Sequence, residues 1–319
     1  MAKCLITGGA GMVGRQLSRL LLSRADSVSI LDLAPANKLP EDIRDHISVV
    51  RADLSNWAEV MDGVRATSPD IIYHIGALMP PASEQAHATA LAVNVGGTVN
   101  VLEAARLFNV PTIVYSSTTA TFSPSLPEDC PNDYAQMPVT MYGVTKVCSE
   151  RLGEYYHRRY GVDFRAVRFL SILGPGRIPG FGWSAYTSLV VEECAKGNPY
   201  VLKVSKELRL RFIYVKDAAL SLMRLGQAAA SSLTARCYNL DGFSASTEEI
   251  AEAVRRHVPG AQISYEFDPD YQHIMDTQYG NIQRRMDDSL ARRNWGWQAS
   301  YGLDDAVRDF VENVQQGLT

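Results

Sequence analysis

The sequence has no long apolar run, no cysteine cluster and no excess of basic residues. None of its hydrophobic stretches reaches the ~20 residues that a membrane-spanning helix needs, and its five cysteines form neither a CxxC pair nor a Cys/His cluster. The formal net charge of −4 offers no basic surface for nucleic acid. The first residues, MAKCLITGG, carry no signal-peptide pattern. We therefore expect a cytoplasmic protein with free thiols and a small-molecule substrate, which binds no nucleic acid, membrane or metal.

Short apolar runs rich in β-branched residues alternate with longer amphipathic stretches through the first two-thirds of the chain. The runs expected as strands are 3–9, 27–33, 47–54, 70–77, 112–117 and 163–172. The stretches expected as helices are 13–24, 57–66, 99–109 and 145–161. This alternation predicts an α/β fold with a doubly wound parallel sheet, the Rossmann arrangement, covered by helices on both faces.

The pattern loosens after about residue 172 and indicates a second, smaller unit. Residues 174–186 are rich in Gly, Pro and aromatics, 211–229 read as a strand and a helix, and a mixed α/β tail follows. Ser246 and Glu249 make a capping box at the start of a helix in that tail. We expect a dinucleotide-binding domain at 1–172, to which 211–235 return, and a mixed α/β substrate-binding domain at 173–210 and 236–319.

The stretch KCLITGGAGMVGRQL predicts a phosphate-binding loop. Gly8, Gly11 and Gly14 stand between an apolar strand and an amphipathic helix, where they allow a tight turn and close approach of a pyrophosphate. Asp32 ends the second expected strand, where a carboxylate can bind a ribose 2′-hydroxyl and would repel a 2′-phosphate. NAD is therefore favoured over NADP. Asp53, after the third strand, either caps a helix or contacts the adenine.

A hydroxyl, a phenol and an amine follow in an order that predicts alcohol oxidation. Thr118 ends an expected parallel strand, where ligands of such sheets bind, and the stretch TMYGVTKVCSE places Tyr142 four residues before Lys146. On a helix these two side chains are neighbours. A nearby ammonium and a positively charged nicotinamide would both lower the tyrosine pKa and let it accept a proton. Thr118 would orient the substrate oxygen while hydride leaves the adjacent carbon.

Taken together, the motifs resemble the extended short-chain dehydrogenases/reductases of the NAD-dependent epimerase/dehydratase family. The segments that carry the likeness, in the family's order, are TGGAGMVG, IIYHIGAL, NVGGTVNVLEAAR, VYSSTTATF, MYGVTKVCSE, RFIYVKDAA and DDSLARRNWGW. The resemblance implies a catalytic triad of Thr118, Tyr142 and Lys146. It also implies a homodimer formed through the outer helices 99–109 and 145–161. The cofactor-binding residues that it implies are Gly8, Gly11, Met12, Val13, Asp32, Asp53, Leu54, Ala77, Tyr142 and Lys146.

Within the family, the likeness is greatest to the short-chain type of L-threonine 3-dehydrogenase. Nucleotide-sugar epimerases carry an arginine at the position where this chain has Leu210, which stands between Arg209 and Arg211. The arginine that binds the substrate carboxylate in the threonine dehydrogenases would, by the resemblance, be Arg209. The segment PGFGWSAYT (179–187) keeps Gly180, Gly182 and Tyr186 but replaces the Thr-Thr-Asp typical of those dehydrogenases. The substrate-binding residues expected on this basis are Ser83, Thr118, Trp183, Ser184, Tyr186, Arg209 and Arg211.

These features lead to an NAD-dependent oxidoreductase that oxidises a secondary alcohol on a small hydroxy acid or β-hydroxy amino acid. A nucleotide-sugar epimerase or dehydratase with retained NAD stays open, although Thr118-Thr119 offers a dehydratase no acidic partner. A third interpretation is a non-catalytic NAD sensor. Such a protein can dispense with the catalytic pair, so the presence of Tyr142 and Lys146 argues against it. The identity of the substrate, and whether NAD dissociates in each cycle, are left open by the sequence.

Overall fold

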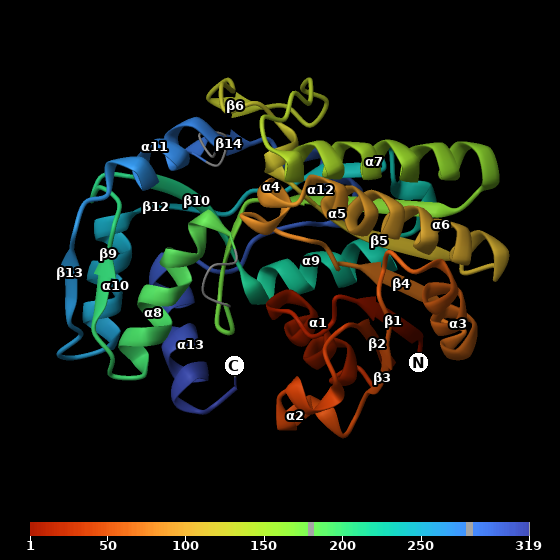
Figure 1. Cartoon of the computed structure of the whole chain (residues 1–319), viewed down its shortest axis with the longest axis horizontal. Coiled ribbons are helices and arrows are strands. Elements are labelled where there is room, and N and C mark those ends of the chain that lie inside the picture. The colour runs from red at the N-terminus through yellow and green to blue at the C-terminus, as the bar shows by residue number, and fades with distance from the viewer. Residues whose placement is uncertain (178–181, 279–282, 319) are drawn as a thin grey trace.

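The computed structural model describes residues 1–177, 182–278 and 283–318 (Figure 1). Its centre is a sheet of seven strands in the order β11-β7-β5-β4-β1-β2-β3, with every pairing parallel. The strands are β1 (Lys3–Thr7), β2 (Ser27–Asp32), β3 (Ser48–Arg51), β4 (Ile71–His74), β5 (Thr112–Thr118), β7 (Asp163–Phe169) and β11 (Cys237–Asn239). The strand order reverses beside β1, and ligands of doubly wound sheets bind outside the carboxyl ends of the strands at such a point.

Helices cover both faces of this sheet because its strands are apolar on both sides. One face packs against α1 (Met12–Leu22) and α9 (Val215–Gln227), and the other against α3 (Trp57–Thr67), α6 (Gly97–Leu107) and α7 (Met141–Tyr160). In β1, Ile6 joins the first core and Leu5 the second, and both are fully buried. Each such burial stabilises the fold by about 1.5–3 kcal/mol.

Smaller sheets and further helices form the rest of the molecule, and many of them, such as β9, β13, α8 and α10, lie at the left in Figure 1. A three-stranded sheet consists of β12 (Phe243–Ser246), β10 (Arg209–Tyr214) and β8 (Ser171–Leu173). Two-stranded pairs join β13 (Ile263–Tyr265) to β9 (Tyr200–Leu202), and β14 (Arg285–Met286) to β6 (Asp129–Cys130). The helices of this part are α8 (Tyr186–Ala195), α10 (Thr247–His257), α11 (Pro269–Gln278), α12 (Ser289–Trp295) and α13 (Leu303–Gln315).

Short helical turns connect the longer elements and lie near the carboxyl ends of several strands. The short α-helices are α2 (Glu41–Arg44), α4 (Ala82–Gln85) and α5 (His87–Ala90), and η2 (Leu91–Gly96) is π-helical. The single 3-10 turns are η1 (Ala36–Lys38), η3 (Thr119–Thr121), η4 (Trp183–Ala185) and η5 (Ala230–Ser232).

The alternation of strands and helices predicted from the sequence is confirmed, with shifts at the element ends. The expected strand 163–172 divides into β7, in the large sheet, and β8, which pairs with β10. The helix expected at 145 begins at Met141, because the Thr140 side chain caps it by accepting from the Gly143 N–H. The capping box of α10 is present as predicted. Within the described ranges, no helix is both long and apolar enough to cross a membrane.

Candidate active site

The glycine loop after β1 is packed so closely that side chains would not fit at several positions. Gly8 has a φ of +68°, and a Cβ there would lie 2.5 Å from the Cα of Gly76. A Cβ on Gly14 would lie 2.5 Å from the Cα of Gly9. Gly11 precedes α1 without any side-chain cap, so the amino end of this helix is open to an anion. The loop thus forms a cradle in which an anion such as a pyrophosphate would fit.

Asp32 fixes the glycine loop against the end of β2. Its Oδ2 accepts from the Ala10 N–H at 3.0 Å, and its Oδ1 accepts from the Ala34 N–H at 2.9 Å. Met12, half-buried, and Val13, buried, form the first turn of α1 beside this loop. A carboxylate at the end of β2 next to a glycine cradle suits the adenosine ribose of NAD, so the residues present fit this cofactor.

Asp53, Leu54 and Ala77 also lie at the carboxyl ends of the strands. The Asp53 carboxylate accepts from both the N–H and the hydroxyl of Ser55, at 2.8 Å each. It therefore organises a turn, and the cap of α3 is Asn56 instead. Leu54 is buried, and Ala77 is half-buried just beyond β4.

The structure brings the predicted phenol and amine together on α7, against the end of β5. The Lys146 ammonium donates to the Ser116 carbonyl at 2.7 Å and lies 5.6 Å from the centre of the Tyr142 ring. It also lies 4.5 Å from the centre of the Tyr115 ring. Thr118 is the last residue of β5 and is half-buried. Lys146 thus bridges the strand that ends in Thr118 and the helix that carries Tyr142.

Burial moves the pKa values of both side chains on α7. It raises the pKa of Tyr142, with Arg177 as the cation that opposes the rise. It lowers the pKa of Lys146 to about 7, against the opposing charge of Glu150. The sequence predicted that a nearby ammonium and a positively charged nicotinamide together lower the tyrosine pKa, whereas among the protein's own groups desolvation of the buried phenol raises it. Lys146 therefore gains and loses its proton near neutral pH.

Glu84 on α4 holds the first turn of α7, and sequence reasoning did not find it. Its carboxylate accepts from the Met141 N–H at 2.8 Å and from the Tyr142 N–H at 3.0 Å. The hydroxyl of fully buried Ser83 donates to the same carboxylate at 2.9 Å. Ser83, predicted to bind substrate, thus contacts the group that positions Tyr142. The sequence gives no signal for this contact, since Glu84 stands in a short polar stretch.

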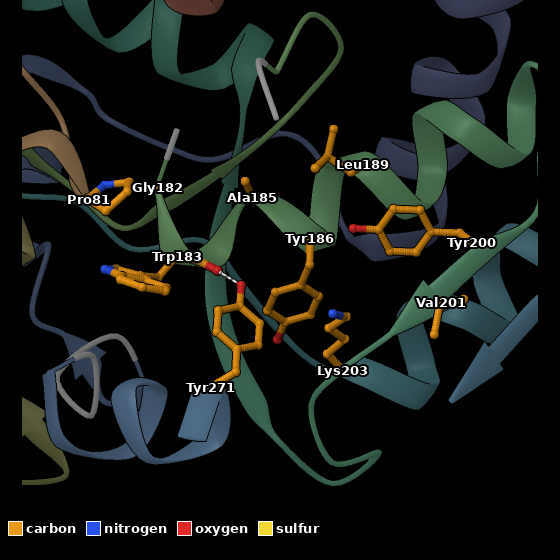
Figure 2. Close-up of a pocket in the computed structure, with 10 residues that line it drawn as sticks. All are labelled: Pro81, Gly182, Trp183, Ala185, Tyr186, Leu189, Tyr200, Val201, Lys203 and Tyr271. Atoms are coloured by element: carbon orange, nitrogen blue, oxygen red, sulfur yellow. Dashed lines mark hydrogen bonds between the residues drawn. The ribbon is translucent and has the colours of Figure 1, made fainter. Parts of the chain in front are cut away.

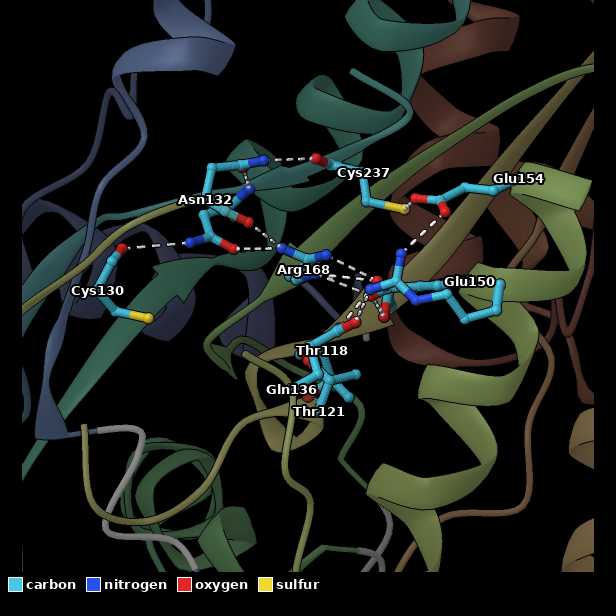
Figure 3. Close-up of polar contacts among 12 residues, drawn as sticks. Thr118, Thr121, Cys130, Asn132, Gln136, Glu150, Glu154, Arg168 and Cys237 are labelled. Carbon is cyan, nitrogen blue, oxygen red and sulfur yellow. Dashed lines mark hydrogen bonds and ion pairs between the residues drawn. The ribbon is translucent and has the colours of Figure 1, made fainter. Parts of the chain in front are cut away.

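A buried ion pair joins α7 to the sheet one turn beyond Lys146 (Figure 3). Arg168 on β7 donates to Glu150 through Nη2 at 2.8 Å and through Nε at 3.0 Å. The Ser117 hydroxyl donates to the same carboxylate at 2.5 Å, and Gln136 donates at 2.9 Å. Burial acts to raise the pKa of Glu150, but the charge and hydrogen bonds of Arg168 outweigh it and leave that pKa lowered. The ion pair therefore fixes the position of α7 relative to β7 in the sheet.

The predicted substrate residues Trp183, Ser184 and Tyr186 lie at the amino end of α8. Figure 2 shows the side chains of Trp183 and Tyr186. The Trp183 indole nitrogen is buried and has no hydrogen-bond partner within the described part of the chain. The Ser171 hydroxyl donates to the Ser184 hydroxyl at 2.8 Å. Tyr186 is buried. Residues 179–181, including the family-like Gly180, lie outside the described residues.

The two predicted arginine ligands already have carboxylate partners. Arg209 and Arg211 alternate along β10 with Leu210, which is buried. The Arg209 guanidinium donates to Glu249 at 2.7 Å, and that of Arg211 donates to both oxygens of Asp241, at 2.8 and 2.6 Å. A substrate carboxylate or diphosphate at either arginine has to join or displace such a pair.

The chain is similar in sequence and in structure to known proteins. The model of the NAD dependent epimerase/dehydratase family matches residues 4–241. A mitochondrial L-threonine 3-dehydrogenase of Bos taurus is 33% identical over 306 residues, which are 96% of this chain and 80% of that protein. The holo structure of a GalE-like L-threonine dehydrogenase from Cupriavidus necator is 30% identical with a TM-score of 0.87, covering 98% of this chain and 99% of that one. A monomeric L-threonine 3-dehydrogenase from a metagenome is 26% identical with a TM-score of 0.88, covering 99% and 100%.

Proposed function

Because this chain belongs to the NAD-dependent epimerase/dehydratase family, we propose that it oxidises a secondary alcohol of a hydroxy acid or β-hydroxy amino acid resembling L-threonine. Its cofactor is NAD. The observation that carries the proposal is the bridge formed by Lys146, which touches the strand ending in Thr118 and lies beside the Tyr142 ring. The named relatives at 30% and 33% identity are L-threonine dehydrogenases, which supports the substrate class.

The proposed reaction divides its work among few side chains. Bound NAD supplies the acceptor for the hydride that leaves the carbinol carbon. The Thr118 hydroxyl orients the substrate oxygen, and Tyr142 accepts the proton from it in the phenolate form. The positive charge of bound NAD would favour that form against the desolvation that raises the pKa of Tyr142. The Lys146 ammonium favours the phenolate form of Tyr142. The hydrogen bond to the half-buried Ser116 carbonyl keeps that ammonium in place, and Glu84 keeps the turn of Tyr142 in place.

The glycine cradle and the end of β2 supply the cofactor contacts in this proposal. Gly8, Gly11, Met12 and Val13 would surround the pyrophosphate, and Asp32 would bind the ribose. The remaining contacts we propose toward the adenine and nicotinamide sides come from Asp53, Leu54, Ala77, Tyr142 and Lys146.

The substrate side is proposed to consist of the predicted residues around α8 and β10. Trp183 offers a buried N–H donor with no acceptor among the described residues, and such a donor is costly unless a ligand oxygen accepts from it. Ser83, Ser184, Tyr186, Arg209 and Arg211 complete the proposed set. We also propose the division into a cofactor domain (1–172 with 211–235) and a substrate domain (173–210 and 236–319), with the correction that β11 (Cys237–Asn239) joins the large sheet and so belongs to the cofactor domain.

We propose in addition a cytoplasmic homodimer formed through α6 and α7. The outer surface of these helices exposes large apolar side chains, among them Leu107 at 48%, Val144 at 45% and Tyr155 at 49%. Exposed apolar side chains on two neighbouring helices can favour association. Sedimentation of the wild type against Tyr155→Glu tests the dimer: a single species at the mass of one chain in the wild type would contradict it.

The function is tested by NADH absorbance with a panel of L-threonine, other β-hydroxy acids, polyols and nucleotide sugars. We expect NADH in stoichiometric yield from a small hydroxy acid or amino acid, and at least about a hundredfold loss of turnover in Tyr142→Phe. Conversion of a nucleotide sugar without net NADH would instead assign the epimerase reaction with retained NAD. Unchanged turnover in Tyr142→Phe would contradict the catalytic role of the phenol.

A further inference from the structure

A cavity of about 320 Å³ lies beside the proposed substrate residues (Figure 2). Four of its lining residues are aromatic. The Trp183 and Tyr271 ring centres are 5.7 Å apart, and those of Tyr186 and Tyr271 are 6.2 Å apart. The residues that line it are Pro81, Gly182, Trp183, Ala185, Tyr186, Leu189, Tyr200, Val201, Lys203 and Tyr271. The volume is suited to a ring-sized group.

This cavity is joined to the catalytic helix by a short series of contacts. The Gly182 N–H donates to the Pro80 carbonyl at 2.6 Å, which ties the segment before α8 to the segment before α4. Pro81 lines the cavity, and α4, which follows it, carries the Glu84 that binds the backbone of Tyr142. The segment that lines the cavity and the turn that carries Tyr142 are therefore held together by direct contacts.

The aromatic side chains of the cavity wall are held in place by contacts within the protein. The Tyr271 hydroxyl donates to the Trp183 carbonyl, and Figure 2 shows the indole nitrogen on the opposite side of that ring from Tyr271. Burial raises the pKa of Tyr200 to about 12 and raises that of Tyr186 further. The tyrosines are therefore uncharged at neutral pH and present flat apolar faces.

Lys203 gives the cavity a positive rim. Its side chain is exposed, it forms no ion pair with the described residues, and no acidic residue is among those that line the cavity. The cavity thus offers aromatic faces along its walls and the Lys203 ammonium at its edge.

From this arrangement we infer that the cavity takes an aromatic substituent of the alcohol substrate, with an anionic or polar group at its far edge that meets Lys203. The inference rests on the proposed function and narrows its substrate class. A methyl group, as on L-threonine, would leave these aromatic walls without contacts, whereas a phenyl ring can stack on them. The protein would then be an oxidoreductase for aryl-substituted β-hydroxy acids.

Matched substrate pairs test the inference by NADH absorbance on the protein saturated with NAD. One pair is L-threonine and L-threo-3-phenylserine, and the other is 3-hydroxybutanoate and 3-hydroxy-3-phenylpropanoate, so that each pair differs only in methyl against phenyl. We expect kcat/KM to be at least about tenfold higher for the phenyl member, since even one added methylene in an apolar pocket changes it by about 10–200-fold. An equal or lower value for the phenyl member would overturn the inference and leave the proposed function intact.

Binding without turnover separates the cavity from the chemistry. Calorimetric titration with 3-phenylpropanoate and butanoate, which have no alcohol, is expected to give at least about tenfold tighter binding of the phenyl compound. Leu189→Trp, which fills the cavity, should abolish that ratio, and the matched Leu107→Trp on the outer surface of α6 should keep it. Equal affinities in the wild type, or a ratio unchanged by Leu189→Trp, would overturn the inference even if no substrate were oxidised.

The role of Lys203 is tested with a ligand that carries a second acid. 3-(4-Carboxyphenyl)propanoate should bind about two- to fivefold more tightly than 3-phenylpropanoate, the range expected of an exposed ion pair. Lys203→Met should remove the gain. A gain that persists in Lys203→Met would show that this ammonium does not meet the far edge of the ligand.

Discussion

Replacing Lys146 by Met should change how stability depends on pH, and not only how active the protein is. Burial lowers the pKa of Lys146 from 10.5 to about 7, so the folded state releases a proton that the unfolded state still binds between these two pH values. In that window the wild type gains stability as pH rises. A methionine has no such proton, so the free energy of unfolding of the variant should lack this slope.

The magnitude follows from the two pKa values. At 1.36 kcal/mol for each pH unit, the difference between 10.5 and about 7 corresponds to about 5 kcal/mol in full. Between pH 7 and pH 9 the wild type should gain about 2–3 kcal/mol over Lys146→Met. The lost contact to the Ser116 carbonyl adds an offset of about 1–3 kcal/mol, but this offset is the same at each pH. His74, whose pKa burial lowers to about 3, does not titrate in this window.

Urea unfolding of the two proteins without cofactor, at pH 6, 7, 8 and 9, measures the difference directly. Lys203→Met is the control, because its ammonium is exposed and the same exchange removes a charge that folding leaves in water. A difference between wild type and Lys146→Met that stays constant from pH 7 to pH 9 would refute the reasoning. It would mean that the ammonium is solvated in the folded protein.

Three further substitutions test the surroundings of the site. Arg168→Gln should lower the free energy of unfolding by about 3–5 kcal/mol, because it leaves the Glu150 carboxylate buried without its partner; urea unfolding measures this, and a loss below about 1 kcal/mol would contradict it. Glu84→Gln should lower kcat about ten- to hundredfold with little change in the KM for NAD, since it displaces the turn of Tyr142; an unchanged kcat would show that this turn is held by other contacts. Asp32→Ala should raise the KM for NAD about tenfold or more and narrow the preference over NADP, as initial rates with both cofactors would show.

The parts of the fold that depend on local pattern could be predicted from the sequence. The apolar strands, the glycine loop and the i, i+4 spacing of Tyr142 and Lys146 each depend on residues close in the chain. The start of α7 was placed late because its signal is the Thr140 cap, which stands before the apolar period begins. Element ends are set by such single contacts.

The contacts that support the site could not be predicted, because strand register and packing decide them. Arg168 lies opposite Ser117 only through the pairing of β7 with β5, and this register brings it to Glu150. The same limit applies to Arg209, which was expected to bind a substrate carboxylate from its sequence context alone. Its contact with Glu249, forty residues further along the chain, could not be read from that context.

Strand β11 forms one edge of the large sheet, next to β7. In the chain it comes after β10, which belongs to the three-stranded sheet. A fragment ending after β7 would therefore lose the strand that pairs with β7 at Ala166 and Val167, and would leave open that edge of a strand whose residues 164–169 are all buried. Such an edge pairs readily with other chains, so the fragment would aggregate. Expression of the cofactor-binding half by itself requires residues through Asn239.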